Sequence, residues 1–84
     1  MAQEYEKIVK DALLSVAPDL EGEEIVPDET FRDQFEIDSI DFLNYVIGLS
    51  KATGLDIPEV DYSELESLQG AVAYLRRRKA SMGF

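Results

Sequence analysis

The sequence predicts an all-α fold, a small four-helix bundle with three longer helices and one short helix. In three separate stretches, apolar residues recur at steps of three and four, which is the spacing of amphipathic helices. No stretch alternates apolar and polar residues as a half-buried strand does. The 84 residues suffice for one domain with a modest core. We therefore expect a single domain over residues 1–84, with frayed ends at residues 1–3 and 80–84.

The first predicted helix covers the N-terminal stretch and ends at Pro18. Its apolar face comprises Tyr5, Ile8, Val9, Ala12, Leu13 and Val16. The acidic stretch 19–29 that follows contains glycine and proline, which favours a loop. We expect three apolar residues to tie this loop to the core: Leu20, Ile25 and Val26. Phe31, Phe35 and Ile37 then predict a short anchored turn, not a strand, before the next helix.

The second long helix is predicted to begin at Ser39 and to end at Gly54. Asp38 stands at the N-cap position, and the carboxylate of Asp41 can accept a hydrogen bond from the Asp38 N–H, as in a capping box. The predicted apolar face consists of Ile40, Leu43, Val46 and Ile47, flanked by Phe42 and Leu49. The helix therefore has both a start signal and a stop signal in the sequence.

The last third of the chain predicts a connector, a short helix and a final helix. Residues 55–58 are extended because the residue before a proline avoids the helical region, and Ile57 and Val60 are expected to point inward. Residues 61–65 suffice for about one helical turn. Ser67 can cap the final helix, whose face comprises Leu68, Ala71, Val72 and Leu75, with Tyr74 beside it. The basic run 76–79 complements the negative end of that helix.

The composition excludes several classes of enzyme. There is no cysteine, so disulfides and thiolate metal sites are impossible, and no histidine, so a Ser-His-Asp hydrolase is excluded. An 84-residue chain also leaves little room for a catalytic cleft with its supporting shell. We expect no catalytic residues, no metal ligands and no enzymatic activity.

The net charge of −10 argues against nucleic acid as a partner and favours basic protein patches. All eighteen acidic residues precede Arg76, whereas half of the eight basic residues lie in the run 76–79. No apolar run has the length of a membrane span, and the N-terminal residues lack the features of a signal peptide. We expect an acidic, monomeric, cytoplasmic protein without membrane insertion.

Three sequence blocks resemble the acyl carrier protein family of phosphopantetheine-binding carriers. The first is Asp38-Ser39-Ile40 with Asp41, at a helix start whose unpaired N–H groups suit a phosphate ester. The second is Gly-Leu-Asp-Ile-Pro at 54–58, and the third is Ser-Leu-Gln-Gly-Ala-Val-Ala-Tyr-Leu at 67–75. Their spacing and the order of the predicted helices also fit, so the resemblance extends over nearly the whole chain to Leu75.

This resemblance implies that Ser39 takes up 4'-phosphopantetheine from coenzyme A and that acyl intermediates are carried as thioesters on the arm. The transferase would supply the base and the metal ion, and Asp38, Ile40 and Asp41 would be recognised by it and by other partners. Those partners would be acyl ligases or synthases with basic docking patches, in fatty-acid, polyketide or related biosynthesis within lipid metabolism. A possible shelter for the acyl chain comprises Leu43, Val46, Ile47, Ile57, Leu65, Leu68 and Val72.

The sequence departs from the family pattern at two places, and the second departure favours a specialised pathway over housekeeping fatty-acid synthesis. Glu36 stands where many members carry glycine. The expected outward positions of the second helix are Asn44, Gly48, Lys51 and Ala52, where fatty-acid carriers usually have glutamates. Two alternatives remain: a peptidyl, aminoacyl or D-alanyl carrier with the same arm, and an unmodified interaction module on the same bundle.

Overall fold

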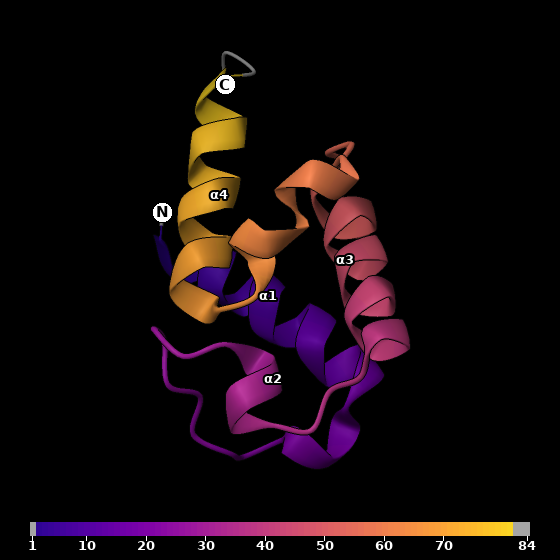
Figure 1. The fold of residues 1–84 in the computed structure, drawn as a ribbon. Coiled ribbons are helices and arrows are strands. Elements are labelled where there is room, and N and C mark those ends of the chain that lie inside the picture. The colour runs from indigo at the N-terminus through magenta and orange to yellow at the C-terminus, as the bar shows by residue number, and fades with distance from the viewer. Residues whose placement is uncertain (1, 82–84) are drawn as a thin grey trace.

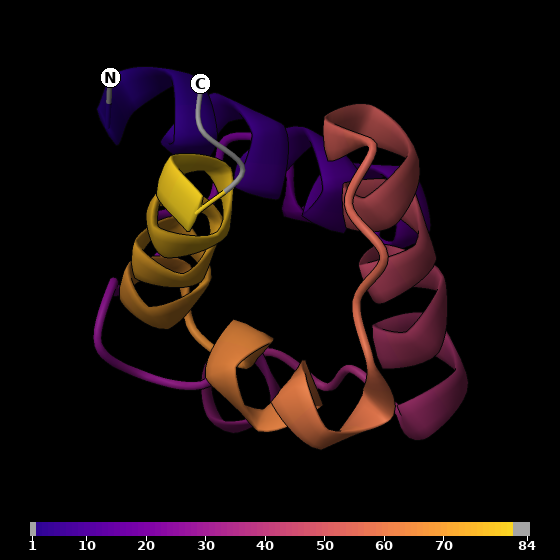
Figure 2. The same cartoon turned by 90° about the horizontal axis from the view of Figure 1, so that it is seen from above.

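The computed structural model describes the backbone of residues 2–81 and the side chains of residues 4–80. Its elements in chain order are α1 (Ala2–Val16), η1 (Pro18–Leu20), α2 (Phe31–Gln34), α3 (Ser39–Thr53), η2 (Glu59–Leu65) and α4 (Leu68–Ser81), where η marks a 3-10 helix. The longer helices α1, α3 and α4 are joined by loops and short helices (Figure 1). Seen from above, α1, α3, η2 and α4 lie on the four sides of a shared core (Figure 2). The predicted all-α bundle is confirmed.

Helix α1 contacts both α3 and α4, and its apolar stripe faces them. Val9, Ala12 and Leu13 are buried, as the heptad-like spacing predicts. Gly48 of α3 faces α1, because a Cβ placed on it would lie 3.6 Å from the Cβ of Ala12. The expectation that Gly48 points outward is therefore wrong, since its small size lets the two helices approach closely.

The acidic loop is held mainly through its backbone. The Gln34 side-chain amide bonds both backbone groups of Val26, with N to Oε1 and Nε2 to O distances of 2.9 Å. Leu20 and Ile25 pack against the core as predicted, but Val26 is exposed, because these bonds fix its backbone and leave the side chain outside. A further hydrogen bond joins the loop to α4, where the Gln69 N–H donates to the Pro27 carbonyl at 2.9 Å.

The short turn predicted around residues 31–37 is the single helical turn α2. Thr30 caps it, since its hydroxyl accepts from the Asp33 N–H at 3.2 Å. Phe31 is buried, and its N–H donates to the Glu66 carbonyl at 2.7 Å. An isolated bridge joins Thr30 to Ser67, and no β-strand forms within residues 2–81. The start of α4 therefore holds α2 in place.

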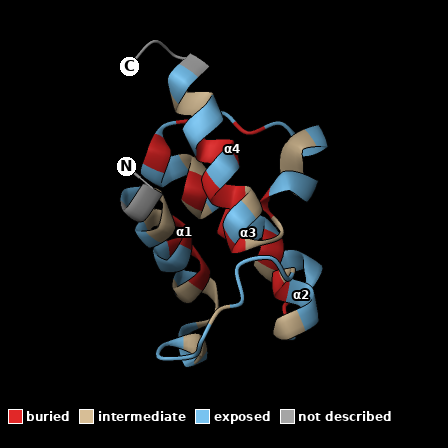
Figure 3. Cartoon of the chain, turned by 90° about the vertical axis from the view of Figure 1, so that its left-hand side faces the viewer, coloured by how far each residue is buried: buried red, intermediate tan, exposed pale blue. Residues whose placement is uncertain are grey.

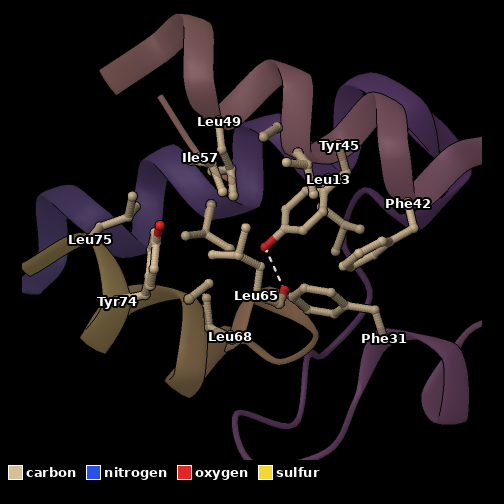
Figure 4. Close-up of a cluster of buried hydrophobic side chains, with 14 of the residues drawn as sticks. Leu13, Phe31, Phe42, Tyr45, Leu49, Ile57, Leu65, Leu68, Tyr74 and Leu75 are labelled. Carbon is tan, nitrogen blue, oxygen red and sulfur yellow. Dashed lines mark hydrogen bonds between the residues drawn. The ribbon is translucent and has the colours of Figure 1, made fainter. Parts of the chain in front are cut away.

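The buried face of α3 differs from the predicted one. It comprises Phe42, Tyr45, Val46, Leu49 and Thr53, which also follow helical spacing. Leu43 and Ile47 were expected inside, but they are 44% and 42% exposed, whereas Ile40, which was also expected to be recognised by partners, is 71% exposed. Tyr45 lies in the core because its hydroxyl donates to the Leu65 carbonyl at 3.0 Å, which satisfies the polar end of a buried ring (Figure 4).

Aromatic and aliphatic side chains from all sides of the bundle fill the core (Figure 4). The Phe31 and Tyr45 rings meet edge to face with centroids 5.4 Å apart, and the Phe42 ring lies 5.6 Å from that of Tyr45. Buried residues lie on the facing sides of the helices, while the loop before α2 is largely exposed (Figure 3). No buried polar side-chain atom among the described residues lacks a hydrogen-bond partner.

Helix η2 is longer than the turn predicted at 61–65, and it exposes one residue expected inside. Ile57 is buried as predicted, but Val60 is 84% exposed. Side chains three residues apart lie in one row of a 3-10 helix, so Val60 shares an outward row with the exposed Ser63. Tyr62 and Leu65 form the inward row and pack against the core.

Helix α4 begins as predicted, with the Gly70 N–H donating to the Ser67 hydroxyl at 3.0 Å. Its predicted apolar face is buried, and Tyr74 is buried with it. The basic run does more than end the helix: Arg77 pairs with Glu64 at 2.6 Å, Arg78 bonds the Asp56 carbonyl at 3.0 Å, and Lys79 bonds the Thr53 carbonyl at 2.8 Å.

Half of the residues expected to fray lie outside the described residues. Met1 and residues 82–84 are not described, whereas the backbone is helical at residues 2, 3, 80 and 81. Among the helices within 2–81, none combines the length and the apolar character that crossing a membrane requires.

Candidate functional site

The start of α3 forms the centre of the candidate site. Asp38 is extended, with φ −84° and ψ 178°, and its Oδ1 accepts from the Asp41 N–H at 2.8 Å. Ser39 is the first helical residue, as predicted, and its side chain is exposed. The carboxylate of Asp41 makes no return bond to the Asp38 N–H in the described structure, so only half of the predicted capping-box exchange forms.

The segment between α2 and α3 fixes the direction from which the chain reaches Ser39. Ile37 is buried, and its N–H donates to the Phe35 carbonyl at 2.9 Å. This anchor lies between α2 and α3, and Arg32 Nη2 of α2 lies 3.5 Å from Ser39 Oγ at the start of α3. The Arg32 guanidinium also lies over the Phe42 ring, with Cζ 5.5 Å from the centroid.

Arg32 was missed by sequence reasoning. Its guanidinium reaches the serine from a different element, seven residues earlier in the chain. The sequence offered one indication of its importance, since Arg32 is one of only four basic residues that precede the run 76–79. Their positions alone would not have shown which one meets Ser39.

The site can accept a group but cannot activate its own hydroxyl. The hydrogen-bond partner of Ser39 Oγ is an arginine, which has no lone pair to take up a proton. No group of metal-binding side chains is present among the described residues. The free N–H groups of the first helical turn and the adjacent guanidinium are both suited to a phosphate ester on Oγ. The residues present therefore fit a phosphate-linked prosthetic group.

The predicted recognition residues surround Ser39 in different environments. Ile40 projects into solvent, Asp38 is exposed, and Asp41 is partly buried. Asp41 also lines a shallow depression together with three other carboxylates, those of Asp19, Glu23 and Glu36. This depression lies between α2 and the segment 16–23.

The predicted shelter residues do not all meet. Five lie in the core: Val46, Ile57, Leu65, Leu68 and Val72. Leu43 and Ile47 lie instead on the outer face of α3 with Ile40, at helical spacing from the serine. We call Ile40, Leu43 and Ile47 the outer ridge. The outer ridge and the buried five are separate surfaces of the same molecule.

A helical bundle that presents an exposed serine at the capped start of a helix has the arrangement of a carrier domain. The comparisons with known proteins agree. The family model described as the phosphopantetheine attachment site matches residues 7–75. The chain therefore belongs to the phosphopantetheine-binding acyl carrier protein family. Its cofactor is 4'-phosphopantetheine, and it is a carrier rather than a catalyst.

Curated relatives support the same assignment. The chain is 27% identical over 73 residues to an acyl carrier protein of Rubrobacter xylanophilus, covering 87% of this chain and 84% of the relative. It is 32% identical over 57 residues to one of Lactobacillus johnsonii, covering 68% and 71%. It is 27% identical over 79 residues to one of Thermosynechococcus vestitus, covering 94% and 91%.

Proposed function

We propose that Ser39 is the attachment residue and that the protein carries acyl intermediates as thioesters for a specialised biosynthetic pathway. The observation that carries this proposal is the position of Ser39, exposed at the capped start of α3 and inside the matched region. The pathway would lie within fatty-acid, polyketide or related lipid metabolism, in the cytoplasm. Loading would come from a phosphopantetheinyl transferase.

Each residue at the start of α3 has a distinct task in this proposal. Asp38 fixes the helix start through its bond to the Asp41 N–H, so that the Ser39 hydroxyl is held away from the core. Ser39 would hold the prosthetic group as a phosphate ester, and its hydroxyl proton would pass to a base of the transferase. The bound group supplies the thiol that carries the acyl cargo. Asp38 and Asp41 would also present negative charge to basic patches on partner enzymes.

The outer ridge supports partner docking through apolar contact as well. Its three aliphatic side chains lie on one face of α3 and begin directly after Ser39. The polar neighbours on the exposed surface are Asn44 and Lys51, not carboxylates. A partner that reads this face needs an apolar patch, with basic groups only toward the Asp38 end. This composition favours dedicated enzymes of a specialised pathway.

The buried part of the predicted shelter remains a candidate for holding a long acyl chain. Val46, Ile57, Leu65, Leu68 and Val72 line the space between α3, η2 and α4. Methyl NMR shifts of these residues should change when a long acyl group replaces the free thiol. Unchanged shifts would indicate that the acyl chain stays outside the core.

The attachment is tested by intact mass after incubation with coenzyme A, magnesium and a broad-specificity phosphopantetheinyl transferase. Wild type and Ser63→Ala should each gain one phosphopantetheinyl group, because Ser63 is an exposed serine on η2, whereas Ser39→Ala should gain none. A gain in folded Ser39→Ala, or none in folded wild type, would overturn the assignment. Loading with acyl and amino-acid ligases then separates an acyl carrier from a peptidyl, aminoacyl or D-alanyl carrier.

The alternative, an unmodified interaction module, differs in what it predicts for Ser39→Ala in the cell. If the bundle acts only as a subunit or adaptor, Ser39→Ala should leave its biological output intact. A Ser39→Ala strain that loses product, while the variant protein stays folded and abundant, excludes that alternative.

A further inference from the structure

Arg32 carries a charge that no carboxylate of the described chain neutralises. Its contacts are the Ser39 hydroxyl at 3.5 Å and the Phe42 ring. By contrast, Arg77 pairs with Glu64 at 2.6 Å, and Arg78 lies 3.7 Å from Asp61. With eighteen acidic residues available, an arginine that meets a neutral hydroxyl instead of a carboxylate is unusual. The Arg32 guanidinium is therefore available to bind an anion beside Ser39.

The position of Arg32 is set by the parts of α2 around it. Phe31, its neighbour, is buried and bonded to the Glu66 carbonyl, and Thr30 caps the turn. The Phe42 ring lies beneath the guanidinium and limits where it can move. The Arg32 side chain extends from α2 to the start of α3, since its Nη2 lies 3.5 Å from Ser39 Oγ.

The guanidinium has more donors than the hydroxyl can use. Arginine presents five N–H groups in a planar fork that matches phosphate oxygens two at a time, whereas the Ser39 hydroxyl offers a single oxygen. In a phosphate ester of Ser39, the non-bridging oxygens lie two bonds from Oγ, within reach of a nitrogen that is 3.5 Å from Oγ. A neutral contact would then become a charge-assisted one.

We propose that Arg32 binds the phosphodiester of the prosthetic group and so fixes the base of the arm between α2 and α3. This inference rests on the proposed attachment at Ser39. Arg32 is a positioning residue, because it holds the phosphate and does not touch the thiol that carries cargo. The base of the arm is therefore held on the α2 side of Ser39.

The test compares holo forms of wild type, Arg32→Gln and Lys51→Gln by ³¹P NMR. Lys51 is the matched control, a basic exposed residue at the opposite end of α3. Intact mass first confirms that each protein is loaded, which tests the attachment separately from the inference. The ³¹P shift and linewidth of each holo protein are then followed from low to high salt, over which the screening length falls from about 30 Å to about 3 Å.

In wild type and Lys51→Gln, the ³¹P resonance should be broadened and should move with salt toward the value in Arg32→Gln. The Arg32→Gln resonance should be sharper and should shift much less. The Arg32 Nε–H resonance of wild type should also move between apo and holo forms. Coincident ³¹P spectra for all three loaded proteins, with an unmoved Arg32 resonance, would overturn the proposal. A wild type that gains no mass would instead refute the attachment at Ser39.

Discussion

The inner and outer faces of α3 both carry large apolar side chains but lie in different environments. The inner face, with Tyr45 and Leu49, is enclosed by α1, η2 and α4. The outer ridge lies at the surface and remains partly or largely exposed. The inner face stabilises the fold, while the outer ridge is available to other proteins. In the proposed function, one helix would thereby combine a structural role with a recognition role.

The largest expected difference between the faces is in stability. Leu49→Ala removes a fully buried side chain and should lower the free energy of unfolding by about 2–5 kcal/mol. Ile47→Ala, its matched control on the outer ridge, should cost less than about 1 kcal/mol, because much of that side chain is already in water. Urea denaturation of both apo proteins measures the two values. Equal losses would contradict the assignment of the faces.

The hydroxyl of Tyr45 is the polar group that fixes the inner face. Tyr45→Phe leaves the buried Leu65 carbonyl without its donor and should cost about 1–3 kcal/mol. Tyr62→Phe is the control, since the Tyr62 ring is half-buried and its hydroxyl makes no hydrogen bond in the described structure. The same denaturation experiment compares them. If Tyr62→Phe lowered the free energy of unfolding as much, the hydrogen bond to the Leu65 carbonyl would not account for the loss in Tyr45→Phe.

Tyr45 should also make stability depend on alkaline pH. Burial raises the pKa of Tyr45 far above its ordinary value, so the folded protein keeps the phenol neutral. The unfolded chain loses this proton near pH 10, so the stabilisation is complete below about pH 10 and falls above it, by about 1.4 kcal/mol per pH unit. Unfolding midpoints measured across this range should decline less steeply in Tyr45→Phe. Burial also raises the pKa of Tyr74, which accounts for part of the remaining decline.

The N-cap at the start of α3 should have a smaller effect on stability. Asp38→Ala removes the acceptor of the Asp41 N–H and should cost about 1 kcal/mol, whereas Asp38→Asn should keep most of the capping energy. Thermal unfolding of the three apo proteins measures this order. Equal melting temperatures for wild type and Asp38→Ala would show that the cap contributes little.

The smallest stability effect and a clear functional effect are expected on the outer ridge. Ile40→Ser should change the free energy of unfolding by no more than about 0.5 kcal/mol, because Ile40 is 71% exposed. It should raise the KM of transferase loading about fivefold, corresponding to the loss of about 1 kcal/mol of interface contact. Val60→Ser, an exposed control on η2, should leave KM unchanged. If the two substitutions changed KM equally, the outer ridge would not be the surface that the transferase recognises.

The candidate site was predicted well where its interactions are local. Asp38 caps residues three positions ahead, Ser67 does the same for α4, and Gly54 ends α3 with a φ of 73°. Caps and stops depend on residues within a few positions of each other, so residue types in order suffice to predict them. The position of Ser39 as the first helical residue followed from the same local pattern.

The predictions that failed depend on contacts between segments or on the type of helix that forms. Val26 and Val60 were expected inside and lie outside, because the Gln34 amide holds the backbone of one and the 3-10 geometry of η2 turns out the other. Arg32 was not singled out, because its meeting with Ser39 depends on how α2 packs beside α3. Val26 and Arg32 required knowing which segments become neighbours, and Val60 required knowing that η2 is a 3-10 helix.

The sequence by itself determined the helices, their caps, the exposed serine and the membership of a carrier family, because these depend on local spacing and short motifs. Only the tertiary structure decided which apolar stripe of α3 is the core. Both stripes follow helical periodicity, so hydrophobic spacing does not distinguish them. The choice depends on where a buried tyrosine finds a hydrogen-bond acceptor, and Leu65, twenty residues away, provides it only once η2 has folded over α3.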